Sequence, residues 1–176
     1  MNIPNKLTIL RIILVPIFVV LMLTRIPYGG TMGAIIFVIA ALTDSLDGYL
    51  ARKWKQTTKL GAILDPLADK LLITAALISL VELGRIPGWI AIVIIGREFA
   101  VTGLRIVKAE EGLIISASRM GKWKTISQVT AVLIIILQHL YQPLATLAVG
   151  QWAMYIAVII TVVSGVEYFQ KNKIPI

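Results

Sequence analysis

The sequence contains no cysteine. Disulfide bonds, thiolate nucleophiles and cysteine-ligated zinc are therefore excluded. Charged residues are scarce: they make up 15% of the 176 residues, whereas about a quarter of a soluble domain is charged. The sequence also lacks sheet-like alternation, internal repeats, low-complexity segments and any separate polar domain. We expect one domain that covers residues 1–176.

Hydrophobic residues make up 58% of the chain and occur in long runs. Such a surface would aggregate in water, so we expect the solvent to be lipid. A helix needs about 20 mostly apolar residues to cross a bilayer, and it satisfies its own backbone hydrogen bonds there. The sequence predicts an all-α, multi-pass protein of the cell membrane. Its six transmembrane helices are expected at about residues 3–24, 31–53, 60–83, 86–108, 121–141 and 145–169.

Lysine and arginine collect on alternate connections between these helices. They are frequent near both termini and in the connections after the second and fourth helices, whereas the opposite turns contain only Arg25 and Arg85. The positive-inside rule therefore predicts cytoplasmic termini. The net charge of +8 follows from this bias and from attraction to anionic headgroups. We expect membrane lipid as a partner, and no nucleic acid.

Four of the nine acidic residues lie close together at the predicted cytoplasmic side. Asp44 and Asp47 are three residues apart near the end of the second helix. Asp65 and Asp69 are four residues apart near the start of the third. Each pair shares one face of its helix. Because the connection at residues 53–59 reverses the chain, the two pairs can face each other.

Ionised carboxylates at this depth cost several kcal/mol each unless they are paired. Hard divalent cations remove their mutual repulsion, and oxygen ligands suit Mg²⁺ or Mn²⁺. Two such ions about 3.5–4 Å apart stabilise the attacking and leaving oxygens of a phosphoryl displacement. The alternative is a set of ordinary ion pairs with nearby basic residues, namely Arg52, Lys53, Lys59 and Lys70. We favour the metal site, with two ions.

The segment that holds these aspartates resembles a known signature. It contains Asp44-Ser-Leu-Asp47-Gly48-Tyr-Leu-Ala51-Arg52, and Gly61, Asp65 and Asp69 follow at the expected spacing. The segment resembles the signature of the CDP-alcohol phosphotransferase family at every fixed position. The resemblance implies transfer of a phosphate-linked group from a CDP-linked lipid or alcohol to an acceptor hydroxyl, with release of CMP.

The resemblance also implies a role for individual residues. Asp44, Asp47 and Asp65 would bind metal. Asp69 would contact the second metal and act as the catalytic general base. The cytidine diphosphate part would be held by Asn5, Thr8, Gly48, Arg52 and Gly61. Arg11 belongs to the same element as Asn5 and Thr8, but taken alone it is better explained by a side chain that reaches to the interface. Family likeness also suggests a homodimer.

A second group of residues bears on the acceptor. Arg97 and Arg105 are eight residues apart on one stripe of the fourth helix, and Lys122 follows the next connection. Fixed cations can bind a phosphate on the acceptor, with arginine in bidentate geometry, and would repel a cationic acceptor such as choline. The alternative is that they only supply the positive-inside charge. Arg97 is balanced between the acceptor site and an ion pair with Glu98.

Four stretches, at residues 2–5, 97–105, 121–125 and 163–169, resemble a bacterial branch of the family. Its members transfer the phosphatidyl group of CDP-diacylglycerol to sn-glycerol 3-phosphate. Two alternatives stay open. One keeps the reaction with inositol phosphate, serine or phosphatidylglycerol as the acceptor. The other is a small cation carrier that uses its intramembrane aspartates, which would give ion flux and need no cytidine site.

Overall fold

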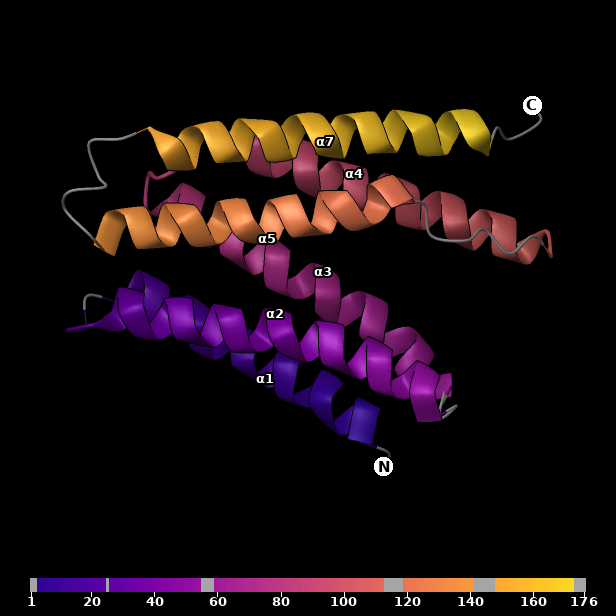
Figure 1. Ribbon diagram of the computed structural model, residues 1–176, viewed down its shortest axis with the longest axis horizontal. Helices are drawn as coiled ribbons and strands as arrows, with labels where there is room; N and C mark the ends of the chain where they lie inside the picture. The colour runs from indigo at the N-terminus through magenta and orange to yellow at the C-terminus, as the bar shows by residue number, and fades with distance from the viewer. Residues whose placement is uncertain (1–2, 25, 55–58, 113–118, 141–147, 173–176) are drawn as a thin grey trace.

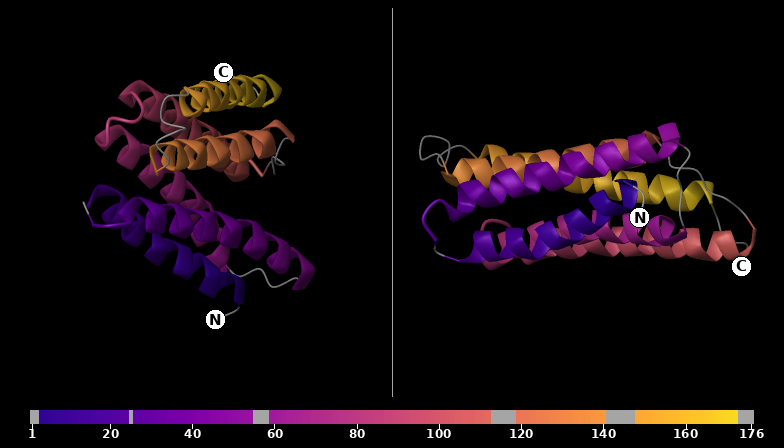
Figure 2. Two further views of the ribbon diagram at one scale, coloured as in Figure 1. Left: turned by 60° about the vertical axis from the view of Figure 1, so that its left-hand side comes forward. Right: turned by 90° about the horizontal axis from the view of Figure 1, so that it is seen from below.

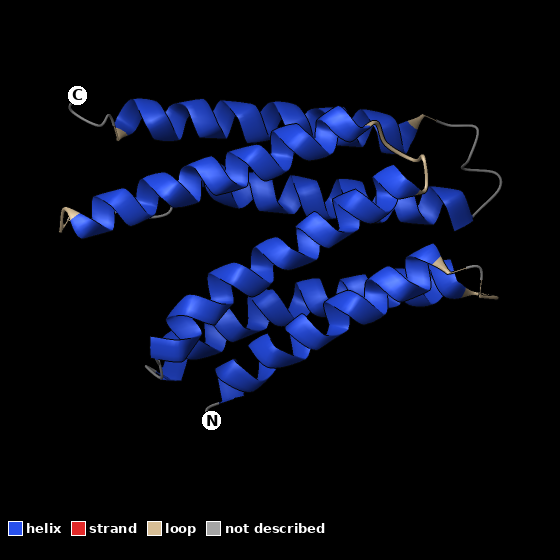
Figure 3. Ribbon diagram, turned by 180° about the vertical axis from the view of Figure 1, so that it is seen from behind, coloured by secondary structure: helices blue, strands red, loops and turns tan. Residues whose placement is uncertain are grey.

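The computed structural model describes residues 3–24, 26–54, 59–112, 119–140 and 148–172; among these, the side chains of 3–5, 44–54, 59–66, 69 and 119 are not described. The described residues form helices and no strand (Figure 3). The all-α prediction is confirmed, with helix ends within a few residues of those expected. The helices are α1 (Ile3–Leu23), α2 (Gly29–Trp54), α3 (Lys59–Glu82), α4 (Gly88–Glu110), α5 (Arg119–Leu140) and α7 (Val149–Lys171).

Glycines shape two of the turns. Gly29 and Gly30 are the first two residues of α2, which therefore begins two residues before the expected start at residue 31. A Cβ atom on Gly29 would lie 2.7 Å from the carbonyl oxygen of Leu21, so the start of α2 approaches the end of α1 very closely. Gly84 lies in the turn between α3 and α4 and has a φ of +66°, which favours glycine. Pro87 then precedes the first residue of α4.

The helices run alternately up and down, so that one end of the bundle collects the starts of α1, α3 and α5 and the ends of α2, α4 and α7 (Figure 1). The chain termini lie at this same end. In one group α1 packs against α2 and α3, and in the other α7 packs against α4 and α5 (Figure 2). Contacts of α2 with α5 and of α3 with α4 join the two groups.

The bundle buries apolar side chains inside and exposes others outside. Phe18 and Phe37 are fully buried, with ring centroids 5.7 Å apart. By contrast, Ile92 is 73% exposed, Trp152 66% and Ile159 61%. Such a surface fits lipid. Within the described residues, three segments are long and apolar enough to cross a membrane: Lys6–Leu23, Met120–Leu140 and Val149–Lys171. The chain is therefore a membrane protein, and six crossings stay a prediction.

Candidate functional site

The predicted metal ligands lie at one end of the bundle. Asp44 and Asp47 belong to the second half of α2, and Asp65 and Asp69 to the first half of α3. These helices pack against each other, and both halves lie at the end that holds the termini (Figure 1). An all-carboxylate donor set on adjoining helix segments fits a hard divalent ion. The side chains themselves lie outside the described residues, as do those of Asn5, Gly48, Arg52 and Gly61.

Of the predicted nucleotide-binding residues, Thr8 has a described side chain. Thr8 is fully buried on α1, and so is Arg11, three residues further along. Both side chains have interaction partners. Because Arg11 has no exposed surface, its interpretation as a side chain that reaches to the interface is wrong. Both residues belong to a helix that packs against α2 and α3, which carry the predicted metal ligands.

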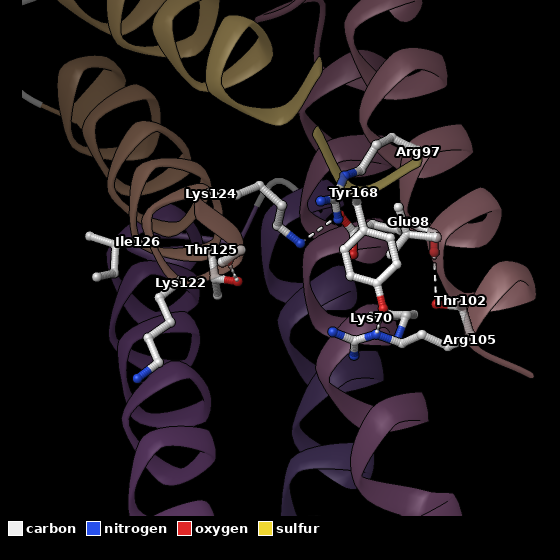
Figure 4. A pocket seen from close by; sticks show the side chains of 12 residues that line it. Lys70, Arg97, Glu98, Thr102, Arg105, Lys122, Lys124, Thr125, Ile126 and Tyr168 are labelled. Carbon is white, nitrogen blue, oxygen red and sulfur yellow. Dashed lines mark hydrogen bonds and ion pairs between the residues drawn. The ribbon is translucent and has the colours of Figure 1, made fainter. Parts of the chain in front are cut away.

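The predicted acceptor residues line one pocket of about 440 Å³ between α3, α4, α5 and α7 (Figure 4). Arg97 and Arg105 come from α4, and Lys122 comes from α5. Lys70 lines the same pocket from α3, directly after Asp69 in the chain. The structure thus brings the three predicted residues together in one pocket, whose wall also includes the residue that follows Asp69 in the chain. The charged lining residues are Lys70, Arg97, Glu98, Arg105, Lys122 and Lys124.

The carboxylate of Glu98 is held between two of these cations. Its Oε1 atom lies 2.5 Å from Nζ of Lys124 and 3.3 Å from Nη1 of Arg97. The three side chains are only 8–13% exposed. The predicted pair of Arg97 with Glu98 is present, whereas the contact with Lys124 was not predicted. The chain thereby ties α4 to α5 through a nearly buried ion-pair network.

Helix α7 supplies partners for both arginines. Nη2 of Arg97 donates to Oγ of Ser164 at 2.5 Å, and Nε of Arg105 donates to the hydroxyl of Tyr168 at 2.8 Å. Sequence reasoning did not assign either α7 residue to the site. The available signal was the four-residue spacing of two hydrogen-bonding side chains on a mostly apolar helix.

The charges that line the pocket can hold an anionic group such as a phosphate. Among its described lining residues the five cations exceed the single carboxylate. Arg105 and Lys122 are exposed and lie on opposite sides of the pocket (Figure 4). A guanidinium group offers two parallel donors to phosphate oxygens, and an ammonium group adds a point charge. A cationic ligand would be repelled here.

Comparison with known proteins agrees with these features. The sequence model of the family described as "CDP-alcohol phosphatidyltransferase" matches residues 1–163 of the chain. The chain is 48% identical to the CDP-diacylglycerol–glycerol-3-phosphate 3-phosphatidyltransferase of Bacillus subtilis, over 97% of this chain and 95% of that protein. It is 43% identical to the protein of the same name in Haemophilus influenzae, over 98% and 94%. It is 41% identical to a probable phosphatidylglycerophosphate synthase of Mycobacterium tuberculosis, over 95% and 79%.

Glu98→Gln should destabilise the bundle, because it removes the charge that compensates two nearly buried cations. Loss of one partner from a buried ion pair costs about 3–5 kcal/mol. We expect the melting temperature in detergent to fall by roughly 6–20 °C. The control is Glu167→Gln, which removes a carboxylate from an exposed pair with Lys171 and should change the melting temperature by less than about 2 °C. Equal melting temperatures for the two variants would contradict the role of Glu98.

Proposed function

The chain belongs to the CDP-alcohol phosphatidyltransferase family, and we propose that it transfers the phosphatidyl group of CDP-diacylglycerol to sn-glycerol 3-phosphate. The products are phosphatidylglycerophosphate and CMP. Relatives named for this reaction match nearly the whole chain. The structural observation that carries the proposal is the cationic pocket, whose wall includes the residue directly after Asp69.

The pocket supports a phosphorylated acceptor. In glycerol 3-phosphate, one end is a phosphate and the other carries hydroxyl groups. Arg105 and Lys122 bind the phosphate from opposite walls, and Arg97 adds a third cation beside them. Serine has no phosphate for these cations to bind. Inositol phosphate has one, so charge alone does not separate it from glycerol 3-phosphate; the names of the relatives favour the glycerol compound.

The donor half of the site is formed by α1, α2 and α3. We propose that Asp44, Asp47, Asp65 and Asp69 hold two Mg²⁺ or Mn²⁺ ions, which when bound neutralise the diphosphate and the departing CMP. Asp69 takes the proton of the acceptor hydroxyl while that oxygen bonds to the phosphorus atom of the phosphatidyl group and the bond to CMP breaks. The cytidine diphosphate part is held by Asn5, Thr8, Gly48, Arg52 and Gly61.

We place this end of the bundle in the cytoplasm. It holds both termini and most of the lysine and arginine residues, which positive-inside bias puts on the cytoplasmic side. Six membrane crossings and cytoplasmic termini belong to the same proposal. Glycerol 3-phosphate is a charged, water-soluble compound, so a cytoplasmic pocket gives it direct access. A homodimer is proposed from the family likeness alone.

An acceptor panel tests the proposed reaction. Purified protein with CDP-diacylglycerol and Mg²⁺ should release CMP when glycerol 3-phosphate is added, and much more slowly with inositol phosphate, serine or phosphatidylglycerol. Failure of glycerol 3-phosphate to stimulate release would refute the proposed acceptor. Ion flux through proteoliposomes without any CMP release would favour the carrier alternative.

Asp69→Asn should abolish turnover, because the amide cannot accept the proton of the acceptor hydroxyl. Loss of a general base lowers kcat by about 10²–10⁴-fold, while binding of CDP-diacylglycerol should change only a few-fold. The control is Glu82→Gln, which removes a carboxylate from the other end of α3 and should leave kcat unchanged. Turnover of Asp69→Asn at the rate of the unmodified protein would show that Asp69 is not the base.

Arg105→Ala should weaken acceptor binding, because it removes charge-assisted hydrogen bonds to the phosphate. Such bonds contribute about 1.5–3 kcal/mol, so the KM for glycerol 3-phosphate should rise roughly 10- to 100-fold. The KM for CDP-diacylglycerol should stay within about twofold. Lys171→Ala removes an exposed cation at the same end of the bundle and serves as the control. An unchanged acceptor KM in Arg105→Ala would place the acceptor site elsewhere.

A further inference from the structure

A row of small or hydrogen-bonding residues lies on one face of the mostly apolar helix α7, and this face is turned toward the arginines of α4. Ser164, Gly165 and Tyr168 belong to this row, and all three are buried. Tyr168 follows Gly165 by three residues and Ser164 by four, so its side chain lies on the same face of the helix as both. Lipid-facing positions of α7 are apolar instead: Ile159 and Val163 are at least half exposed. The row is therefore an internal surface of the bundle.

Tyr168 anchors Arg105. The phenol ring is only 4% exposed and packs with Val101 and Leu104 of α4 in a small apolar cluster. Its hydroxyl accepts the Nε–H of Arg105 at 2.8 Å, and the guanidinium carbon lies 5.4 Å from the ring centroid. Arg105 itself is exposed, and an exposed arginine otherwise occupies many rotamers. The bond to Tyr168 uses Nε, and the two terminal nitrogens make no hydrogen bond to the part of the chain that the structure describes, so they can bind a ligand.

Ser164 and Gly165 form a seat for Arg97. The serine hydroxyl binds Nη2 of Arg97 at 2.5 Å. A Cβ atom built on Gly165 would lie 3.1 Å from Cγ of Arg97, which is closer than an ordinary contact, and 3.4 Å from its Nε. The absence of a side chain at position 165 thus lets the arginine lie directly against the α7 backbone. Glu98 holds the same guanidinium group from α4.

We infer that Ser164, Gly165 and Tyr168 of α7 are positioning residues for acceptor recognition: they fix Arg97 and Arg105 so that the phosphate of the acceptor meets a preformed pair of guanidinium groups. A preordered arginine loses less rotamer freedom when it binds, and misplacement of a binding group weakens positioning of the substrate. This inference rests on the proposed acceptor site. It assigns α7, which carries none of the predicted catalytic aspartates, a part in specificity.

Tyr168→Phe tests the anchor, because it removes the hydroxyl and keeps the ring in its apolar cluster. We expect the KM for glycerol 3-phosphate to rise about three- to tenfold, with the KM for CDP-diacylglycerol and the melting temperature unchanged. Tyr155→Phe is the matched control, because it removes a hydroxyl near the opposite end of α7, where Tyr155 stacks on Trp89. An acceptor KM for Tyr168→Phe equal to that of Tyr155→Phe would overturn the anchor.

The double variant Tyr168→Phe with Arg105→Ala separates positioning from direct binding. If Tyr168 acts through Arg105, the double variant should have the acceptor KM of Arg105→Ala alone, because interacting residues are not additive. Fully additive effects would overturn the inference and assign Tyr168 to the ligand itself. If Arg105→Ala leaves the acceptor KM unchanged, both the acceptor site and the role of α7 fail. If only Arg105→Ala raises it, the acceptor site stands and the role of α7 fails.

The seat of Arg97 is tested with Gly165→Ala and Ser164→Ala. The new methyl group should displace Arg97 by a few tenths of an ångström and raise the acceptor KM roughly two- to fivefold. Gly96→Ala is the control, because a Cβ atom there has open space around it. Ser164→Thr keeps the hydroxyl and should restore the KM lost in Ser164→Ala. No rise in Gly165→Ala and Ser164→Ala, or no rescue by threonine, would refute the seat.

Binding measured without turnover gives a second readout. Glycerol 3-phosphate should raise the melting temperature of the unmodified protein in the absence of CDP-diacylglycerol, because a ligand stabilises the state that binds it. The same concentration should give a smaller rise with Tyr168→Phe and Gly165→Ala, and an undiminished rise with Tyr155→Phe and Gly96→Ala. Undiminished rises in all four variants would contradict the positioning role.

Discussion

Glu98 joins three helices through a single carboxylate oxygen. Its Oε1 accepts from Lys124 on α5 and from Arg97 on α4, and Arg97 continues to Ser164 on α7. Buried cations cost several kcal/mol each when they lack a counter-ion. Without this carboxylate, Arg97 and Lys124 would repel each other across the α4–α5 contact. Among the described residues, Glu98 is the one carboxylate that lines the pocket, and it links α4 directly to α5 and, through Arg97, to α7.

The charged residues that line the pocket form two parts with different roles. Arg97, Glu98 and Lys124 form a nearly buried, partly compensated network that holds the wall together. Arg105 and Lys122 are exposed, and the described partner of Arg105 is a neutral phenol, which does not cancel its charge. The uncompensated positive charge lies where a ligand can reach it. Arg97 belongs to both parts, because its guanidinium group contacts Glu98 and Ser164 in the wall and also lines the pocket together with Arg105.

The sequence predicts the helices well because lipid imposes a simple rule on apolar runs and the turns between them. The sequence also singles out Arg97 and Arg105 as residues of one site, because cations within an apolar stretch are conspicuous. The contact of Lys124 with Glu98 was not predicted, since it joins residues on different helices and depends on how α4 packs against α5. Tyr168 was missed for a related reason: an aromatic residue in an apolar helix suits lipid and core equally. Burial of Arg11 likewise depends on the packing of α1.

The distribution of charge also determines how an acceptor is oriented in the proposed reaction. Aspartates gather on α2 and α3, whereas the pocket between α3, α4, α5 and α7 is cationic. A ligand with a phosphate at one end and hydroxyl groups at the other is pulled by its phosphate toward Arg105 and Lys122 and away from the carboxylates. Its hydroxyl end is then directed toward α3, where Lys70 directly follows Asp69. An acceptor without a phosphate lacks this polarity, so the pocket could bind it without presenting its hydroxyl to the base.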